Sequence, residues 1–173
     1  MNQSELFDKL TSALPIHLYG EGVAKSFQHL WREIEDGETS IIWENSHPIR
    51  VVQFAFVEIF SHDGKTLVED RQEFGDGRIR RRGFRGISEK LKGSENSLDG
   101  AKRGILEELG LNPELLSLEF VGMNNQENES SSYPGLMTRY TKFHYKTELP
   151  PEMYQEEYIE NGSDGMKTFF GWH

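Results

Sequence analysis

Two adjacent glutamates, Glu107 and Glu108, are the residues whose type and spacing point most directly to chemistry. The stretch from residue 95 to 111 predicts a helix, because Asn96 or Ser97 can cap its start and Gly110 can end it. Apolar residues recur along it at helical spacing, at Leu98, Ala101, Ile105 and Leu109. Both glutamates fall on the opposite side. Adjacent carboxylates on one helix face supply the oxygen ligands that hard divalent cations prefer.

Two further charged residues can brace this helix. Arg103 lies one turn before Glu107, so an ion pair within the helix is available. Glu95 lies just before the helix, where it can reach back to Arg103. Position 104 shares the face of Glu107 and Glu108 but holds glycine, which brings no carboxylate.

This order of residues resembles the Nudix box, usually written G-x5-E-x7-R-E-U-x-E-E-x-G-U, where U is an aliphatic residue. The places that match are Glu95, Arg103, Ile105, Glu107, Glu108 and the ending Gly110-Leu111. Two places depart from the pattern, because its opening glycine would fall at Glu89 and its second glutamate at Gly104.

The resemblance implies a divalent-metal-dependent hydrolase of a nucleoside diphosphate linked to another group, a pyrophosphohydrolase that uses Mg²⁺ or Mn²⁺. Carried over by position, Glu107 and Glu108 would ligate the metal. Arg103 and Glu95 would hold the loop and the helix in register, completing the implied catalytic set. The fold implied is an α+β Nudix-type α/β/α sandwich with a mixed sheet.

Gly104 alters this expectation, because in the family the glutamate at that place often serves as a further metal ligand or as the general base. Losing a positioned base typically costs about 10²–10⁴-fold in rate. An active enzyme would need another carboxylate, for which Glu95, Glu127 and Glu129 are candidates. The alternatives are a catalytically inactive module that binds a nucleotide or a protein, or a glutamate pair that is only a solvated helix face.

The segment from residue 78 to 85 holds five arginines in eight residues. Such a run is often a solvated face that offsets an acidic chain. It also leads directly toward the acidic helix, where the oxygens of a polyphosphate would need partners, and the arginine fork suits them. Arg80, Arg82 and Arg85 are therefore the predicted substrate-binding residues.

Composition narrows the partners and the class of protein. The net charge of −10 over 173 residues argues against binding to duplex nucleic acid, which phosphate contacts drive. No apolar run is long enough to cross a bilayer, and the first residues do not resemble a signal peptide. The absence of cysteine excludes disulfides and thiolate metal sites, and fits a cytoplasmic protein.

The expected organisation is a helical N-terminal extension, residues 1–47, packed on a Nudix-like domain, residues 48–173. Residues 3–14 and 22–36 give the helical patterns of the extension. In the domain, residues 49–60 predict a central strand with a hairpin partner at 66–71. Further along we expect a strand at 78–85, a polar loop at 124–132, a strand at 138–147, a short helix within 152–160 and a last strand at 167–172.

Overall fold

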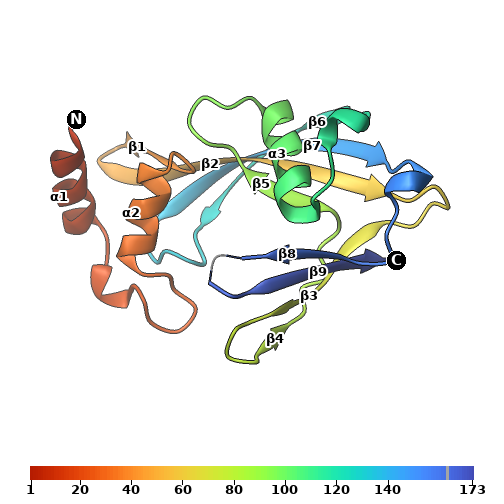
Figure 1. Ribbon diagram of the computed structural model, residues 1–173. Coiled ribbons are helices and arrows are strands. Elements are labelled where there is room, and N and C mark those ends of the chain that lie inside the picture. The colour runs from red at the N-terminus through yellow and green to blue at the C-terminus, as the bar shows by residue number, and fades with distance from the viewer. Residues whose placement is uncertain (163) are drawn as a thin grey trace. The chain divides into compact units, whose positions relative to one another are not determined.

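A computed structural model of the chain describes residues 1–162 and 164–173. Its α-helices are α1 (Gln3–Ala13), α2 (Phe27–Glu35) and α3 (Ser97–Leu109), with single 3₁₀ turns η1 (Ile16–Leu18), η2 (Pro113–Leu115) and η3 (Pro151–Met153). The strands are β1 (Ser40–Glu44), β2 (His47–Phe60), β3 (Leu67–Glu73), β4 (Ile79–Arg80), β5 (Ile87–Lys90), β6 (Glu119–Glu129), β7 (Met137–Glu148), β8 (Tyr158–Asn161) and β9 (Lys167–Trp172) (Figure 1). The predicted α+β fold is confirmed.

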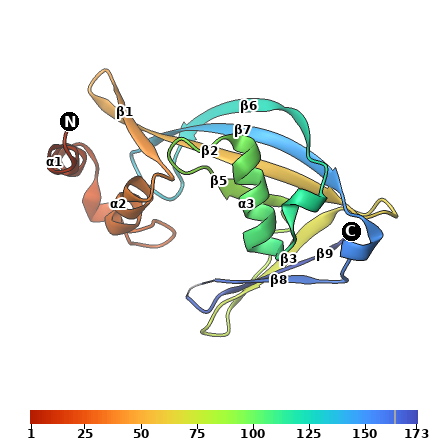
Figure 2. The same ribbon diagram turned by 45° about the horizontal axis from the view of Figure 1, so that its top comes forward.

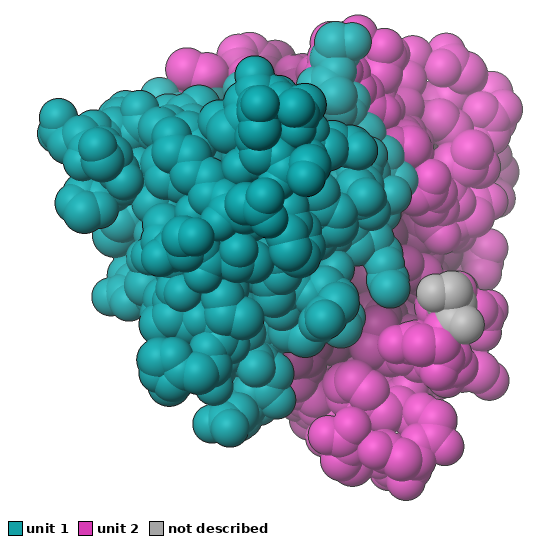
Figure 3. Space-filling view, turned by 90° about the vertical axis from the view of Figure 1, so that its left-hand side faces the viewer, with its two compact units in different colours: residues 1–53, 90–94, 125–141 teal, residues 54–89, 95–124, 142–173 magenta. Residues whose placement is uncertain are grey.

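The strands form two sheets. One has the order β1-β2-β7-β6, with β5 also pairing with β2, and the other has the order β4-β3-β9-β8. The chain divides into two compact units, coloured separately in Figure 3: residues 1–53, 90–94 and 125–141 form unit 1, and residues 54–89, 95–124 and 142–173 form unit 2. The boundary between residues 47 and 48 that the sequence indicated stays a prediction.

Unit 1 holds the two N-terminal helices, both expected from the sequence. The helix α1 begins at a capping box, in which the Asn2 side chain accepts from the Glu5 N–H and Glu5 accepts from the Asn2 N–H. The helix α2 begins later than predicted, because the Ser26 side chain caps it and the preceding residues are irregular. Their inward faces share a core whose fully or nearly buried members are Leu10, Leu14, Phe27, Leu30, Tyr133 and Leu136.

Unit 2 contains the four-stranded sheet and the glutamate-bearing helix. The strand β3 pairs antiparallel with β9, and β9 pairs antiparallel with β8. The helix α3 contacts β8, as Figures 1 and 2 show from two directions. It buries Ala101, Ile105 and Leu109 as predicted, whereas Leu98 stays 39% exposed because it lies in the first turn.

One glycine fixes the segment that leads into β5. Gly86 has a φ of +64°, and a Cβ there would lie 2.0 Å from the carbonyl oxygen of Val57. Its N–H donates to the carbonyl of Leu67, while the carbonyl of Phe84 accepts from the N–H of Glu69. The segment is thereby held against the neighbouring backbone in a way that only glycine permits.

Several local predictions were wrong. Residues 66–71 turn back as a strand, but their pairing with β2 is limited to an isolated antiparallel bridge between Phe60 and Thr66, because β3 pairs with β4 and β9 instead. The arginine run is a strand only at β4, and residues 152–160 give η3 and the start of β8 in place of a helix. The polar stretch 124–132 is not a loop, since most of it belongs to β6, which pairs with β7. Across the described residues no helix is long and apolar enough to cross a membrane.

Candidate active site

The helix α3 presents its charged side chains because both of its ends are fixed locally. The Asn96 side chain accepts from the N–H of Asp99 at 2.9 Å. Gly110 ends the helix in the left-handed conformation, with a φ of +66°. Of the two N-cap candidates the structure uses Asn96, and Gly110 ends the helix as predicted.

Arg103 is the centre of a carboxylate network within unit 2. Its Nε and Nη2 donate to the two carboxylate oxygens of Glu95, each at 3.0 Å. Its Nη1 donates to Glu89 at 2.7 Å and to Glu107 at 3.4 Å. These contacts raise the pKa of Arg103, the hydrogen bond that it donates to Glu95 contributing most. The structure thus brings Glu95, Arg103 and Glu107 together as predicted, and it adds Glu89.

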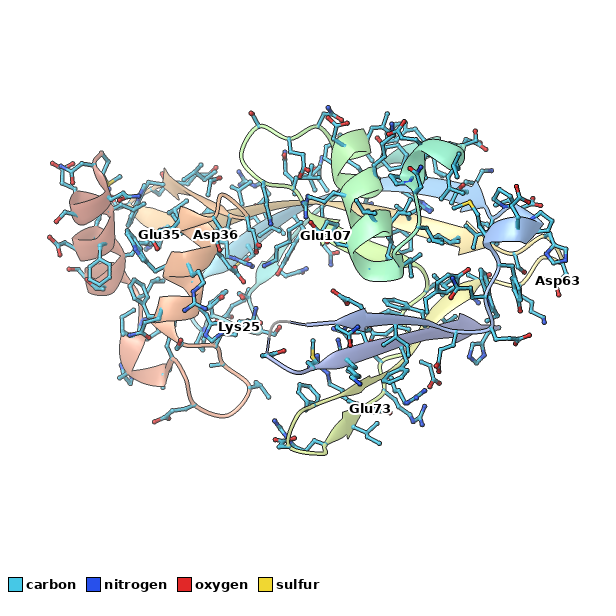
Figure 4. The ribbon with its side chains drawn as sticks, viewed as in Figure 1. Lys25, Glu35, Asp36, Asp63, Glu73 and Glu107 are labelled. Atoms are coloured by element: carbon cyan, nitrogen blue, oxygen red, sulfur yellow. The ribbon has the colours of Figure 1, made fainter. Side chains whose placement is uncertain are left out.

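The two adjacent glutamates have different surroundings. Glu107, labelled beside α3 in Figure 4, is exposed, and within the described part of the chain its carboxylate makes only the long contact with Arg103. Glu108 is half-buried and lines a cavity. Among the described residues the carboxylate of Glu108 makes no hydrogen bond or ion pair, so its charge lacks a cation partner there. A carboxylate in that position is costly to ionise.

The electrostatics around Glu108 identify further carboxylates nearby. Burial raises the pKa of Glu108 to about 9, with contributions from the negative charges of Glu160, Glu89, Glu69 and Glu107. Burial also raises the pKa of Glu160, on β8, although a hydrogen bond with Thr168 lowers it. The negative charges of Glu89, Glu69 and Glu107 raise the pKa of Glu160 further. Carboxylates from α3, β3, β5 and β8 therefore act on one another in this part of unit 2.

Arginines hold two of these carboxylates. Glu69 is buried and accepts from Arg82 at two points, and Glu89 accepts from Arg103. Within residues 1–162 and 164–173 no group of three or more His, Asp and Glu side chains is arranged to hold a metal ion. The donor chemistry nevertheless suits a hard divalent cation, because all the available ligands are carboxylate oxygens and one carboxylate has no counter-charge among the described residues.

The cavity beside Glu108 has a volume of about 490 Å³. This volume falls in the range of small-molecule sites, about 300–1,000 Å³. Its walls combine aromatic rings with charges of both signs. The lining residues are Phe54, Phe56, Glu69, Arg82, Phe84, Arg85, Gly86, Ile87, Ser88, Glu108, Lys142 and Phe170. Such a cavity can hold an anionic molecule that also has a flat apolar part.

The structure separates the three predicted substrate-binding arginines. Arg82 and Arg85 line the cavity. The guanidinium of Arg82 also lies 4.6 Å from the ring centre of Phe84. Arg80 is not among the lining residues, and its side chain donates to Gln72. The remaining basic residue of the cavity, Lys142, lies 4.9 Å from the ring centre of Phe56 and was not predicted.

The glutamates proposed to replace the missing carboxylate have other partners. Glu95 is engaged by Arg103 at both oxygens. In unit 1, Glu127 accepts from Arg139, and Glu129 accepts from the N–H of Gly135. The carboxylates that act on Glu108 are instead Glu69, Glu89 and Glu160, which the sequence analysis missed. Of these, only Glu89 left a signal, because it occupies a place where the Nudix pattern has glycine.

Comparison with known proteins gives similarity of fold only. No protein-family model matches the sequence, and no curated protein is significantly similar to it. The dihydroneopterin triphosphate pyrophosphohydrolase of E. coli is 18% identical over 69% of this chain and 78% of that chain, with a TM-score of 0.49. The Ap4A hydrolase of C. elegans is 16% identical over 68% and 79%, with a TM-score of 0.40. The Nudix domain of Shewanella oneidensis NrtR, complexed with ADP ribose, is 15% identical over 69% and 70%, with a TM-score of 0.41.

Proposed function

We propose that this protein is a divalent-metal-dependent hydrolase of a nucleoside diphosphate linked to another group. The observation that supports this most is the position of Glu108. It is a half-buried carboxylate with no cation partner among the described residues, in a cavity that Arg82, Arg85 and Lys142 also line. A carboxylate that could ligate a metal and basic side chains that could meet a phosphate therefore line the same cavity of unit 2.

Glu107 and Glu108 are the proposed metal ligands, in agreement with the Nudix resemblance. A bound Mg²⁺ or Mn²⁺ would neutralise the diphosphate and activate the attacking water. Arg103 keeps Glu95, just before α3, and Glu107, in the last turn of α3, in place through contacts of 3.0 and 3.4 Å. Its role is to position these carboxylates.

The substrate would be held by the cavity itself. Arg82 uses Nε and Nη2 to bind Glu69, so its Nη1 side can meet a phosphate oxygen. Arg85 and Lys142 add positive charge, which offsets the acidic surroundings for an anionic substrate. Phe54, Phe56, Phe84 and Phe170 offer ring faces to a nucleobase or to the linked group.

The test is release of phosphate or nucleoside monophosphate from a panel of nucleoside diphosphate compounds, with Mg²⁺ and then Mn²⁺. We expect metal-dependent turnover that Glu108→Gln lowers by about 10²-fold or more, since a metal ligand is lost. Glu119→Gln is the matched control, because Glu119 is an exposed glutamate of unit 2 outside this cavity, paired with Lys146. Turnover that is equal in both variants would refute the assignment of Glu108.

A second function, a nucleotide-binding module without turnover, has one observation in its favour. The described residues contain no ready-made group of three metal-binding side chains. Under this alternative the cavity would bind the nucleotide and the carboxylates would not act on it. Thermal stabilisation by the same compounds without any hydrolysis, in either metal, would select this function over the enzyme.

A further inference from the structure

Gly104 is buried in the middle of α3 because another side chain occupies the space beside it. A Cβ at position 104 would lie 2.9 Å from the Cβ of Glu89 and 3.5 Å from its Cγ. It would also lie 3.4 Å from Cδ1 of Ile87. A contact of 2.9 Å between two Cβ atoms cannot be relieved by rotating a side chain, since both atoms are fixed by the backbone. Glu89 on β5 and a side chain at position 104 on α3 thus exclude each other.

The carboxylate of Glu89 acts where a carboxylate from position 104 would be expected. On the helix, position 104 lies one turn before Glu107 and Glu108 and between them around the axis. Glu89 contacts Arg103 at 2.7 Å, and its charge acts on both Glu108 and Glu160. A side chain from the strand therefore reaches the acidic face of the helix at the position of the glycine.

The two departures from the Nudix pattern fall on these same two residues. The pattern has glycine where this chain has Glu89, and glutamate where this chain has Gly104. Glutamates at both positions would overlap, and glycines at both would leave no carboxylate there. The exchange retains one carboxylate and one glycine, with the carboxylate now supplied by β5.

We propose that Glu89 is the third carboxylate ligand of the divalent cation bound by Glu107 and Glu108. Strand β5 thus supplies the carboxylate that α3 lacks at Gly104. This inference rests on the proposed function and names a ligand of the same site. Its donor oxygens suit Mg²⁺ and Mn²⁺, as do those of the two helix residues. Among the described residues these three carboxylates are not gathered around one point, so the cation would draw the side chains of Glu89 and Glu107 away from Arg103 and toward Glu108. The contact with Arg103 directs the Glu89 side chain toward α3.

The test is Mn²⁺ binding to the full chain, measured by calorimetry and by the loss of the free Mn²⁺ signal in electron paramagnetic resonance. Glu89→Gln keeps the size and a hydrogen-bonding oxygen for Arg103 but loses the negative charge, so we expect Mn²⁺ affinity to fall at least tenfold. Glu119→Gln, the exposed control, should bind as the wild type does. Thermal unfolding without metal reports separately any structural role of Glu89.

The exchange itself is tested by moving the carboxylate back to the helix. Glu89→Gly alone should lose Mn²⁺ affinity, and Gly104→Glu alone should lower the unfolding temperature, because the two side chains overlap. The double variant Glu89→Gly with Gly104→Glu should recover Mn²⁺ affinity to within a few-fold of the wild type.

Each outcome bears on the inference. If Glu89→Gln lowers the unfolding temperature but binds Mn²⁺ as the wild type does, Glu89 is structural and the inference is overturned. A wild type that binds no Mn²⁺ overturns it together with the metal-dependent function. The protein could also bind Mn²⁺ in a way that depends on Glu89 and yet hydrolyse none of the nucleoside diphosphate compounds. That result would overturn the proposed enzyme and leave the inference about Glu89 standing.

Discussion

Arg82 and Glu69 face each other in a two-point contact on the wall of the cavity, with Nε of the arginine 2.8 Å from Oε1 of the glutamate and Nη2 bonded to Oε2. Glu69 is only 5% exposed, so the arginine is anchored to a buried carboxylate. Such a contact fixes the plane of the guanidinium and leaves its far side toward the cavity. Glu69 is therefore a positioning residue for Arg82.

Glu69→Gln should weaken substrate binding more than it slows the chemical step. Glutamine keeps one hydrogen bond to Arg82 but loses the charge and the second acceptor, so the guanidinium is held less firmly. We expect KM to rise about tenfold, with a much smaller change in kcat. This pattern is typical when an interaction that binds the substrate and the transition state equally is lost. Glu73→Gln, a partly exposed position of β3 that pairs with Arg71, serves as the control in the same kinetic assay. An unchanged KM would show that Arg82 does not depend on Glu69.

Gly104→Ala should destabilise the wild type although alanine favours helices. Helix propensity alone would add about 1 kcal/mol of stability. The new Cβ would meet the Cβ of Glu89 at 2.9 Å, and overpacking of this kind costs about 1–3 kcal/mol. In the Glu89→Gly background the obstacle is gone, so the same substitution should stabilise. Urea unfolding of the four proteins measures the coupling, and additive effects would contradict the contact.

Gly86→Ala should be among the most damaging single substitutions in unit 2. Its Cβ would lie 2.0 Å from the Val57 carbonyl oxygen, in addition to the strain of a φ of +64°. We expect a loss of about 2–6 kcal/mol, the sum of typical strain and overpacking costs. Gly83→Ala separates the two effects, because Gly83 has a φ of +66° and nothing within 4 Å of its Cβ. If both variants lose equal stability, the clash at Gly86 plays no part.

Unit 1 should lose stability in acid through Glu33. Burial by itself raises the pKa of Glu33, but the hydrogen bond from Lys90 and the charges of Arg50 and Lys90 outweigh it and lower the pKa to about 2. Because the folded pKa lies below the ordinary value of 4.5, this stabilisation is complete above pH 4.5 and is lost as the pH falls toward 2. The size of the effect is about 3 kcal/mol.

The measurement is urea unfolding between pH 2 and pH 6 for the wild type and Glu33→Gln. The variant leaves the guanidinium of Arg50, which lies 2.6 Å from Glu33, buried without this counter-charge, so it should be less stable near neutral pH. The free energy of unfolding of the variant should fall less steeply between pH 4.5 and 2. Parallel curves for the two proteins would mean that Glu33 does not carry this dependence.

The strongest of the patterns that depend on neighbours in sequence predicted the structure correctly. The helix α3, its caps and the contacts of Arg103 with Glu95 and Glu107 follow from spacing along one helix. The long strands β2 and β7 follow from apolar and alternating residues. The polar part of β6, residues 124–129, was wrongly predicted as a loop, because its Asn, Gln and Glu residues have low strand propensity and it becomes a strand by pairing with the distant β7.

The amino-acid sequence by itself determined the acidic helix, its bracing arginine and the two departures from the Nudix pattern, because each depends on residues within one segment. Only the tertiary structure decided what those departures mean. Glu89 and Gly104 lie on different elements, and their shared space exists only when β5 packs beside α3. The same packing buries Glu108 among carboxylates from other strands, and burial depends on long-range contacts that no local pattern encodes.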